Sequence, residues 1–123
     1  MDLNELLMER LNILEENHVI SNEAGNFSKK AVMLILSEIP DLEETKAVMF
    51  ITHLAMAGQR ILDGENEIPL DTLVLNSVMG EPVYKQAQVL RDELLQETDI
   101  QFPQSEKDFL TVHLCNLLTY QGY

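Results

Sequence analysis

The sequence predicts an all-α protein, a compact bundle of five to six helices. Apolar residues recur with helical periodicity along most of the chain, whereas β-branched residues are scattered and seldom alternate with polar ones. Prolines and glycines fall between the periodic segments, where they predict short loops. No segment repeats at a fixed period or is low in complexity. Helices joined by short loops bury their apolar faces against one another, which is the architecture of a bundle.

The first helix is predicted at the start of the chain. Asp2 is followed three residues later by Glu5, a capping-box-like pair that begins an acidic helix ending near Glu16. One face of this helix carries its apolar residues, Leu3, Leu6, Leu7, Leu11 and Leu14.

A loop and a short apolar helix are predicted next. Residues 20–28, ISNEAGNFS, are rich in turn-forming residues and predict the loop. Ser28 is the expected N-cap of the helix that follows. This helix must end before Pro40, because the residue before a proline avoids the helical conformation.

A long helix is predicted from about Leu42 to Asp63, with Gly64 ending it. Its apolar stripe consists of Ala47, Val48, Ile51, Leu54, Ala55, Gly58 and Ile61. Four methionines are also expected at helical core positions, namely Met33, Met49, Met56 and Met79.

Two further helices follow. A short one is predicted after Pro69, from about 70 to 78, and ends at Gly80. The next spans about 83–97, with Pro82 at its start. The residues of this helix expected to point inward are Ala87, Leu90 and Leu94.

The last helix is opened by Pro103 and Ser105, with Asp108 placed to complete the cap. The pattern as a whole divides the chain into an N-terminal acidic helix and loop, residues 1–27, and a helical domain, residues 28–120.

Composition limits the functions that such a bundle can have. With 123 residues, of which 46% are hydrophobic, the chain is long enough for one domain with a real core. Its 21 acidic residues outnumber the 8 basic ones and give a net charge of −13. So acidic a surface is repelled by phosphate backbones and by anionic bilayers, and we expect no direct binding of nucleic acid or membranes.

Location follows from the cysteine count and the N-terminus. A single cysteine, Cys115, excludes an intrachain disulfide and a zinc site built from cysteines. The N-terminus is acidic where a signal peptide would be basic, and no apolar run reaches about 20 residues. We therefore expect a cytoplasmic protein.

The usual motifs of enzymes are absent from the sequence, and its many carboxylates are mostly expected on solvated faces. We therefore expect no enzymatic activity and no cofactor. Lys46, His53 and Arg60 are spaced by seven residues and line up along one helix face. They form either an anion or phosphoryl site around His53, or a partly buried histidine between ordinary helix cations.

A second histidine, His113, lies in the last helix, with Glu106 seven residues earlier. It is either a core or rim residue or a nucleophile towards phosphorus, because neutral imidazole is a good nucleophile near its pKa. Cys115 is expected as a small buried hydrophobe, and His18 as a solvated side chain. A metal site made of His53, His113 and a carboxylate lacks local ligand spacing, and none is predicted.

Two segments resemble the histidine motifs of the PTS regulation domain, or PRD, over about residues 28–118. FITHLAMAGQRILDGE, residues 50–65, resembles the first motif through His53, Arg60 and Gly64. DIQFPQSEKDFLTVHLCNLL, residues 99–118, resembles the second motif through Pro103, Glu106, Phe109, Leu110, His113 and Leu114. PVYKQAQVLRDELLQE resembles the amphipathic helix that connects them in the family.

The chain departs from the family at two places. Ile68-Pro69-Leu70 stands where the family often has Asn-Pro-Leu, and Gly80-Glu81 where it often has Tyr-Pro. These departures affect the packing of the short helix more than the histidines.

The resemblance implies a cytoplasmic regulatory module of bacterial transcription or antitermination control. His53 and His113 would accept phosphoryl groups from the phosphocarrier HPr or from an enzyme II B component, and phosphorylation would shift a homodimer interface. Lys46 and Arg60 would be cations beside His53. Because only an acidic helix and a loop precede the domain, we expect a stand-alone PRD that acts through a partner protein carrying the output domain.

Two other functions remain open at this stage. A dimerisation or scaffold protein with degenerate histidines would keep the fold without phosphorylation. A small helical protein that binds a metal or another ligand would use the same histidines differently.

Overall fold

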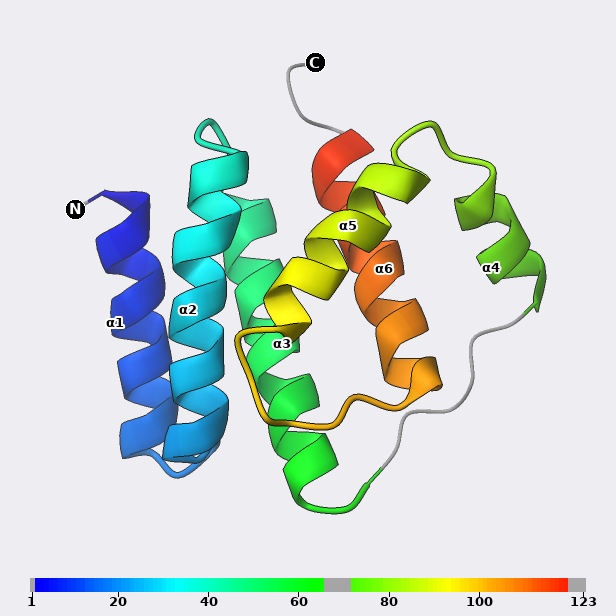
Figure 1. Cartoon of the computed structure of the whole chain (residues 1–123). Coiled ribbons are helices and arrows are strands. Elements are labelled where there is room, and N and C mark those ends of the chain that lie inside the picture. Colours follow the sequence, from blue (N-terminus) through cyan, green and yellow to red (C-terminus); the bar gives the residue numbers. More distant parts are fainter. Residues whose placement is uncertain (1, 66–71, 120–123) are drawn as a thin grey trace.

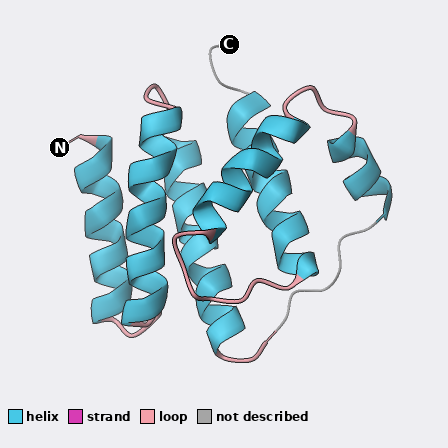
Figure 2. Cartoon of the chain, viewed as in Figure 1, coloured by secondary structure: helices cyan, strands magenta, loops and turns pink. Residues whose placement is uncertain are grey.

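The structure is a computed structural model that describes residues 2–65 and 72–119. Six helices and no strand occur in these residues, as Figure 2 shows, which confirms the all-α class. The helices are α1 (Leu3–Glu16), α2 (Asn22–Glu38), α3 (Glu44–Leu62), α4 (Thr72–Met79), α5 (Tyr84–Leu95) and α6 (Gln104–Thr119). Within the described part of the chain, no helix is both long and apolar enough to cross a bilayer.

Helices α1, α2 and α3 form the N-terminal half of the bundle and pack against one another (Figure 1). The predicted cap of α1 is confirmed, because the Asp2 carboxylate accepts a hydrogen bond of 2.8 Å from the Glu5 N–H. The helix ends at Glu16, as predicted. Leu7 and Leu11 are fully buried, so α1 contributes to the common core.

Helix α2 begins earlier than the sequence predicts, and the prediction of a loop at residues 20–28 is wrong. Ser21 is the N-cap, and its hydroxyl accepts a hydrogen bond from the Ala24 N–H. Ser28 lies buried inside the helix and donates its hydroxyl to the Ala24 carbonyl. The expected division at residues 27 and 28 stays a prediction, and it falls within this continuous helix.

Packing against α1 explains why turn-forming residues are helical here. Gly25, which favours a turn in isolation, lies where a Cβ would collide with the Glu15 carboxylate of α1. Ala24 and Phe27 are buried in the core at the same level. The tertiary contacts of this segment therefore override its local preference.

The ends of α2 and α3 are confirmed. Helix α2 ends at Glu38, two residues before Pro40. Helix α3 ends at Leu62, and Gly64 adopts a left-handed φ of 80° that favours glycine. Most of the predicted apolar stripe of α3 is buried, and Val48 and Ile61 are half-buried.

The core positions predicted for the methionines are wrong. Met33, Met49, Met56 and Met79 expose between 39% and 66% of their surface. The core is filled instead mainly by leucine, isoleucine, alanine and phenylalanine side chains, and these four methionines are not part of it. Met49 and Met56 of α3 lie on either side of His53 in the sequence and present apolar surface to solvent near it.

Helices α4 and α5 come next along the chain. The predicted start of α4 near Pro69 and Leu70 lies outside the described residues, and the helix ends at Met79. Helix α4 has no buried residue. In α5 the three residues predicted to point inward, Ala87, Leu90 and Leu94, are all buried.

Helix α6 packs on α5 and α3. It begins at Gln104, so Ser105 lies in its first turn and not at the cap, while Asp108 accepts a hydrogen bond from the Gln104 side chain. Figure 1 shows that α6 runs in the opposite direction to α3. This antiparallel pair carries the candidate site.

Candidate functional site

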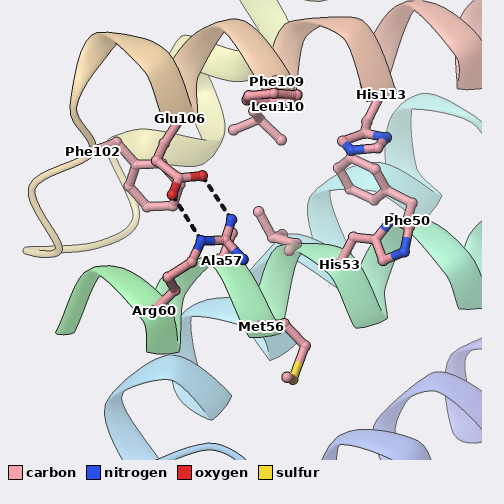
Figure 3. Close-up of a pocket in the computed structure, with 11 residues that line it drawn as sticks. Phe50, His53, Met56, Ala57, Arg60, Phe102, Glu106, Phe109, Leu110 and His113 are labelled. Atoms are coloured by element: carbon pink, nitrogen blue, oxygen red, sulfur yellow. Dashed lines mark hydrogen bonds and ion pairs between the residues drawn. The ribbon is translucent and has the colours of Figure 1, made fainter. Parts of the chain in front are cut away.

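Two histidines meet where α3 and α6 pack. His53 of α3 and His113 of α6 have ring centroids 5.2 Å apart, with their ring planes tilted by 53° (Figure 3). The sequence placed them sixty residues apart on different helices and did not show that they meet. The fold therefore joins the two candidate residues into one histidine pair.

The two rings of the pair have different environments. His53 is exposed, whereas His113 is half-buried. Burial lowers the pKa of His113 below its ordinary value of 6.5, and the positive charge that His53 can carry lowers this pKa further. His113 is therefore a neutral imidazole near pH 7, with a ring nitrogen lone pair available.

A second polar pair lies two helical turns away. Arg60 of α3 donates two hydrogen bonds to the carboxylate of Glu106 in α6, from Nε to Oε2 at 3.0 Å and from Nη2 to Oε1 at 2.9 Å. The side chain of Glu106 is 1% exposed and that of Arg60 is 29% exposed. This bidentate arrangement is the strong form of an arginine–carboxylate pair.

The two pairs share one register. Arg60 lies seven residues after His53 on α3, and its partner Glu106 lies seven residues before His113 on the antiparallel α6. Each helix repeats its polar residue after seven positions, nearly two turns, so both pairs face each other on the same side of the helices. The matched spacing of His53 to Arg60 and Glu106 to His113 is the signal from which sequence reasoning could have predicted this register.

The role expected for Arg60 changes with this geometry. Lys46, His53 and Arg60 do follow one another along α3, but the guanidinium of Arg60 is held by Glu106. A carboxylate as deeply buried as Glu106 depends on its cationic partner, because its desolvation is not otherwise offset. The sequence relates Glu106 only to His113, by a spacing of seven residues, and does not predict its ion pair with Arg60.

Two hollows flank the histidine pair, and both include Phe50, His53 and His113. One, with a volume of about 300 Å³, extends to Arg60 and Glu106 and is here called the Arg60 hollow. The other, of about 340 Å³, extends to Lys46 and is called the Lys46 hollow. The remaining residues of the Lys46 hollow are Met49, Asn116 and Leu117. Phe102 also lines the Arg60 hollow, which the sequence does not predict.

The other candidate residues lie apart from this site. His18 is exposed beyond the end of α1 with a φ of 59°, in agreement with the expected solvated side chain. Cys115 is buried, as predicted, and its burial raises the pKa of the thiol. Among residues 2–65 and 72–119, no group of three or more His, Cys, Asp or Glu side chains is placed to hold a metal ion.

The fold and the site define a small all-α domain that presents a histidine pair at its surface. The family model of the PRD domain matches residues 27–117, which is most of the chain. The chain therefore belongs to the PRD domain family, in agreement with the resemblance of its two histidine motifs. No curated protein and no solved structure was found to match it.

Membership of this family gives the general class of function. PRD domains are regulatory modules of the phosphotransferase system and are not catalytic. The chain is thus a regulatory module linked to that system, and its interactions are those of phosphotransferase-related proteins in general.

Proposed function

We propose that His53 and His113 form the phosphoacceptor site of this regulatory module. The observation that carries the proposal is the approach of the two rings, with centroids 5.2 Å apart, at a place where His53 is exposed. A carrier protein must bring its own phosphohistidine to the acceptor ring, and an exposed histidine beside two hollows meets that requirement. The expected donors are the phosphocarrier HPr and an enzyme II B component.

The transfer uses the lone pair of a neutral imidazole. That lone pair forms the new N–P bond while the N–P bond to the carrier's histidine breaks and its electrons return to the carrier's ring. The acceptor ring loses a proton from its other nitrogen, and the carrier's ring gains one, so charge and protons balance. The lowered pKa of His113 favours the neutral form that this step needs.

Phosphorylation adds about two negative charges to the surface formed by α3 and α6. On a chain with a net charge of −13, such an addition alters any interface that includes this surface. The module would act in the cytoplasm as a homodimer and signal through a protein partner that carries the output domain of transcription or antitermination control. Direct contact with nucleic acid or membranes is not part of the proposal.

A second candidate is a dimerisation or scaffold protein whose histidines are not phosphorylated. The exposed side chains of Met49 and Met56 beside His53 favour it, because apolar surface of this kind suits a protein interface. This candidate predicts that His53→Ala and His113→Ala leave self-association unchanged.

The test is incubation of the chain with phosphorylated HPr and with phosphorylated B components. The expected result is an acid-labile phosphohistidine, detected as added mass that disappears after acid treatment. An unchanged mass with every cognate carrier would overturn the proposal and support the scaffold function.

A further inference from the structure

The two hollows beside the histidine pair differ in charge. The Arg60 hollow contains a cation and a carboxylate that bond to each other, Arg60 and Glu106. The Lys46 hollow contains Lys46 and Asn116, and none of the described residues that line it is acidic. A phosphoryl group on one of the rings would therefore have different charged neighbours in the Arg60 hollow than in the Lys46 hollow.

The Arg60 hollow is poorly suited to an anion. Arg60 donates from Nε and from Nη2 to the carboxylate of Glu106, as the dashed lines in Figure 3 show. If a phosphoryl group drew Arg60 away, a carboxylate with 1% side-chain exposure would lose these two bonds beside a new dianion. Most of the other side chains around this hollow are apolar and offer no donor, among them Leu54, Ala57, Phe102, Phe109 and Leu110.

The Lys46 hollow offers donors from both helices. Lys46 lies seven residues before His53 on α3, and Asn116 lies three residues after His113 on α6, so each shares a helix face with its histidine. The ammonium of lysine is a compact cation with three N–H donors, and the asparagine amide adds two more. Both residues line the same hollow as the two rings.

We propose that the phosphoryl group carried by the histidine pair is held in the Lys46 hollow, by the Lys46 ammonium and the Asn116 amide. Arg60 remains bonded to Glu106 in both states. This inference rests on the proposed phosphoacceptor function and assigns the anion subsite within it.

The test compares Lys46→Met and Asn116→Ala with a matched control, Lys30→Met, which removes the same charge from an exposed position on α2. Each variant is equilibrated with phosphorylated HPr, and the phosphorylated fraction is measured by intact mass. The equilibrium constant for transfer should fall about tenfold in Lys46→Met and about threefold in Asn116→Ala, as expected for lost charge-assisted and neutral hydrogen bonds. Lys30→Met should match the wild type.

The outcomes separate this inference from the proposed function. A wild-type chain that is never labelled overturns the phosphoacceptor function. If the wild type is labelled, but Lys46→Met and Asn116→Ala have the same equilibrium constant for transfer as Lys30→Met, only the assignment of the phosphoryl group to the Lys46 hollow is overturned. A second readout is the Arg60 Nε–H resonance in an NMR spectrum, which should keep its position on phosphorylation, whereas a large shift would show that Arg60 has left Glu106.

Discussion

His113 couples the chemistry of the site to pH. Its pKa is lowered first by burial and second by the positive charge of His53, so its state depends on its neighbour across the pair. His113 binds its proton less tightly in the folded chain than in the unfolded chain, where histidines have a pKa of about 6.5. The unfolded chain therefore binds more protons as the pH falls below this value, and the free energy of unfolding decreases until the pH is below the folded pKa.

We predict that His53→Gln raises the pKa of His113 towards 6.5, because the variant removes the charge of the neighbouring ring but leaves most of the burial. The measurement is an NMR titration of the His113 ring protons in both chains. We also expect the free energy of unfolding of the wild type to fall as the pH drops below about 7, more than that of a His113→Asn variant. An identical His113 midpoint in wild type and His53→Gln would contradict the coupling.

The ion pair of Arg60 and Glu106 predicts a second result at the scale of single residues. Arg60→Met removes the two hydrogen bonds that the guanidinium donates to the buried Glu106 carboxylate, and should lower the free energy of unfolding by about 3 kcal/mol. Adding Glu106→Leu to this variant should restore most of the lost free energy of unfolding, because the double variant does not bury this carboxylate. Urea denaturation followed by circular dichroism measures both, and a single variant as stable as the wild type would refute the role of the pair.

The packing of α3 against α6 positions the site at the scale of elements. Their antiparallel direction and shared register place histidine opposite histidine and arginine opposite glutamate. The sequence predicted both helices and the residues on each of them, because periodicity and the positions of Pro40, Gly64 and Pro103 are local signals. It did not predict that they face each other, because that depends on the path of the chain between them.

The start of α2 shows where local signals fail. Asn22, Gly25 and Asn26 favour a turn, but the segment after the Ser21 N-cap becomes helical because it packs on α1 and buries Phe27. The prediction that four methionines lie in the core is wrong for a related reason. Helical periodicity shows which residues share a face, but the number of neighbouring helices decides how much of that face is covered.

Two serine variants test the start of α2. Ser21→Ala removes the N-cap acceptor of the Ala24 N–H and should lower the free energy of unfolding by about 1 kcal/mol. Ser28→Ala should change it by less than about 0.5 kcal/mol, because the Ser28 hydroxyl only bonds to a carbonyl one turn earlier in the same helix. Thermal or urea denaturation ranks the two, and a larger loss for Ser28→Ala would indicate that the helix begins at residue 28 instead.

At the scale of the whole molecule, the described helices other than α4 contribute buried residues to one core. Leu7 and Leu11 of α1 are buried together with the apolar residues of α2 and α3, although the family match begins only at residue 27. The acidic N-terminal helix is thus a structural part of the bundle in this chain. Of the acidic residues that the structure describes, all except Glu106 are at least partly exposed on this unit.

Removal of residues 1–20 tests this integration. The shortened chain would expose the faces of α2 and α3 that α1 covers, and we expect it to lose cooperative unfolding and to bind a hydrophobic dye. The control is the full chain with Asp2→Ala, which removes only a helix cap and should lose about 1 kcal/mol. A shortened chain that unfolds cooperatively at the same urea concentration would show that α1 is dispensable.

The central claim is that the paired histidines accept phosphoryl groups, and the three histidines of the chain allow a direct test. The double variant His53→Ala and His113→Ala keeps only His18, which is exposed and far from the pair in the sequence. Wild type and double variant are incubated with phosphorylated HPr and B components, and phosphohistidine is measured by intact mass. We predict acid-labile label on the wild type and none on the double variant, whereas equal labelling of the two chains would contradict the account.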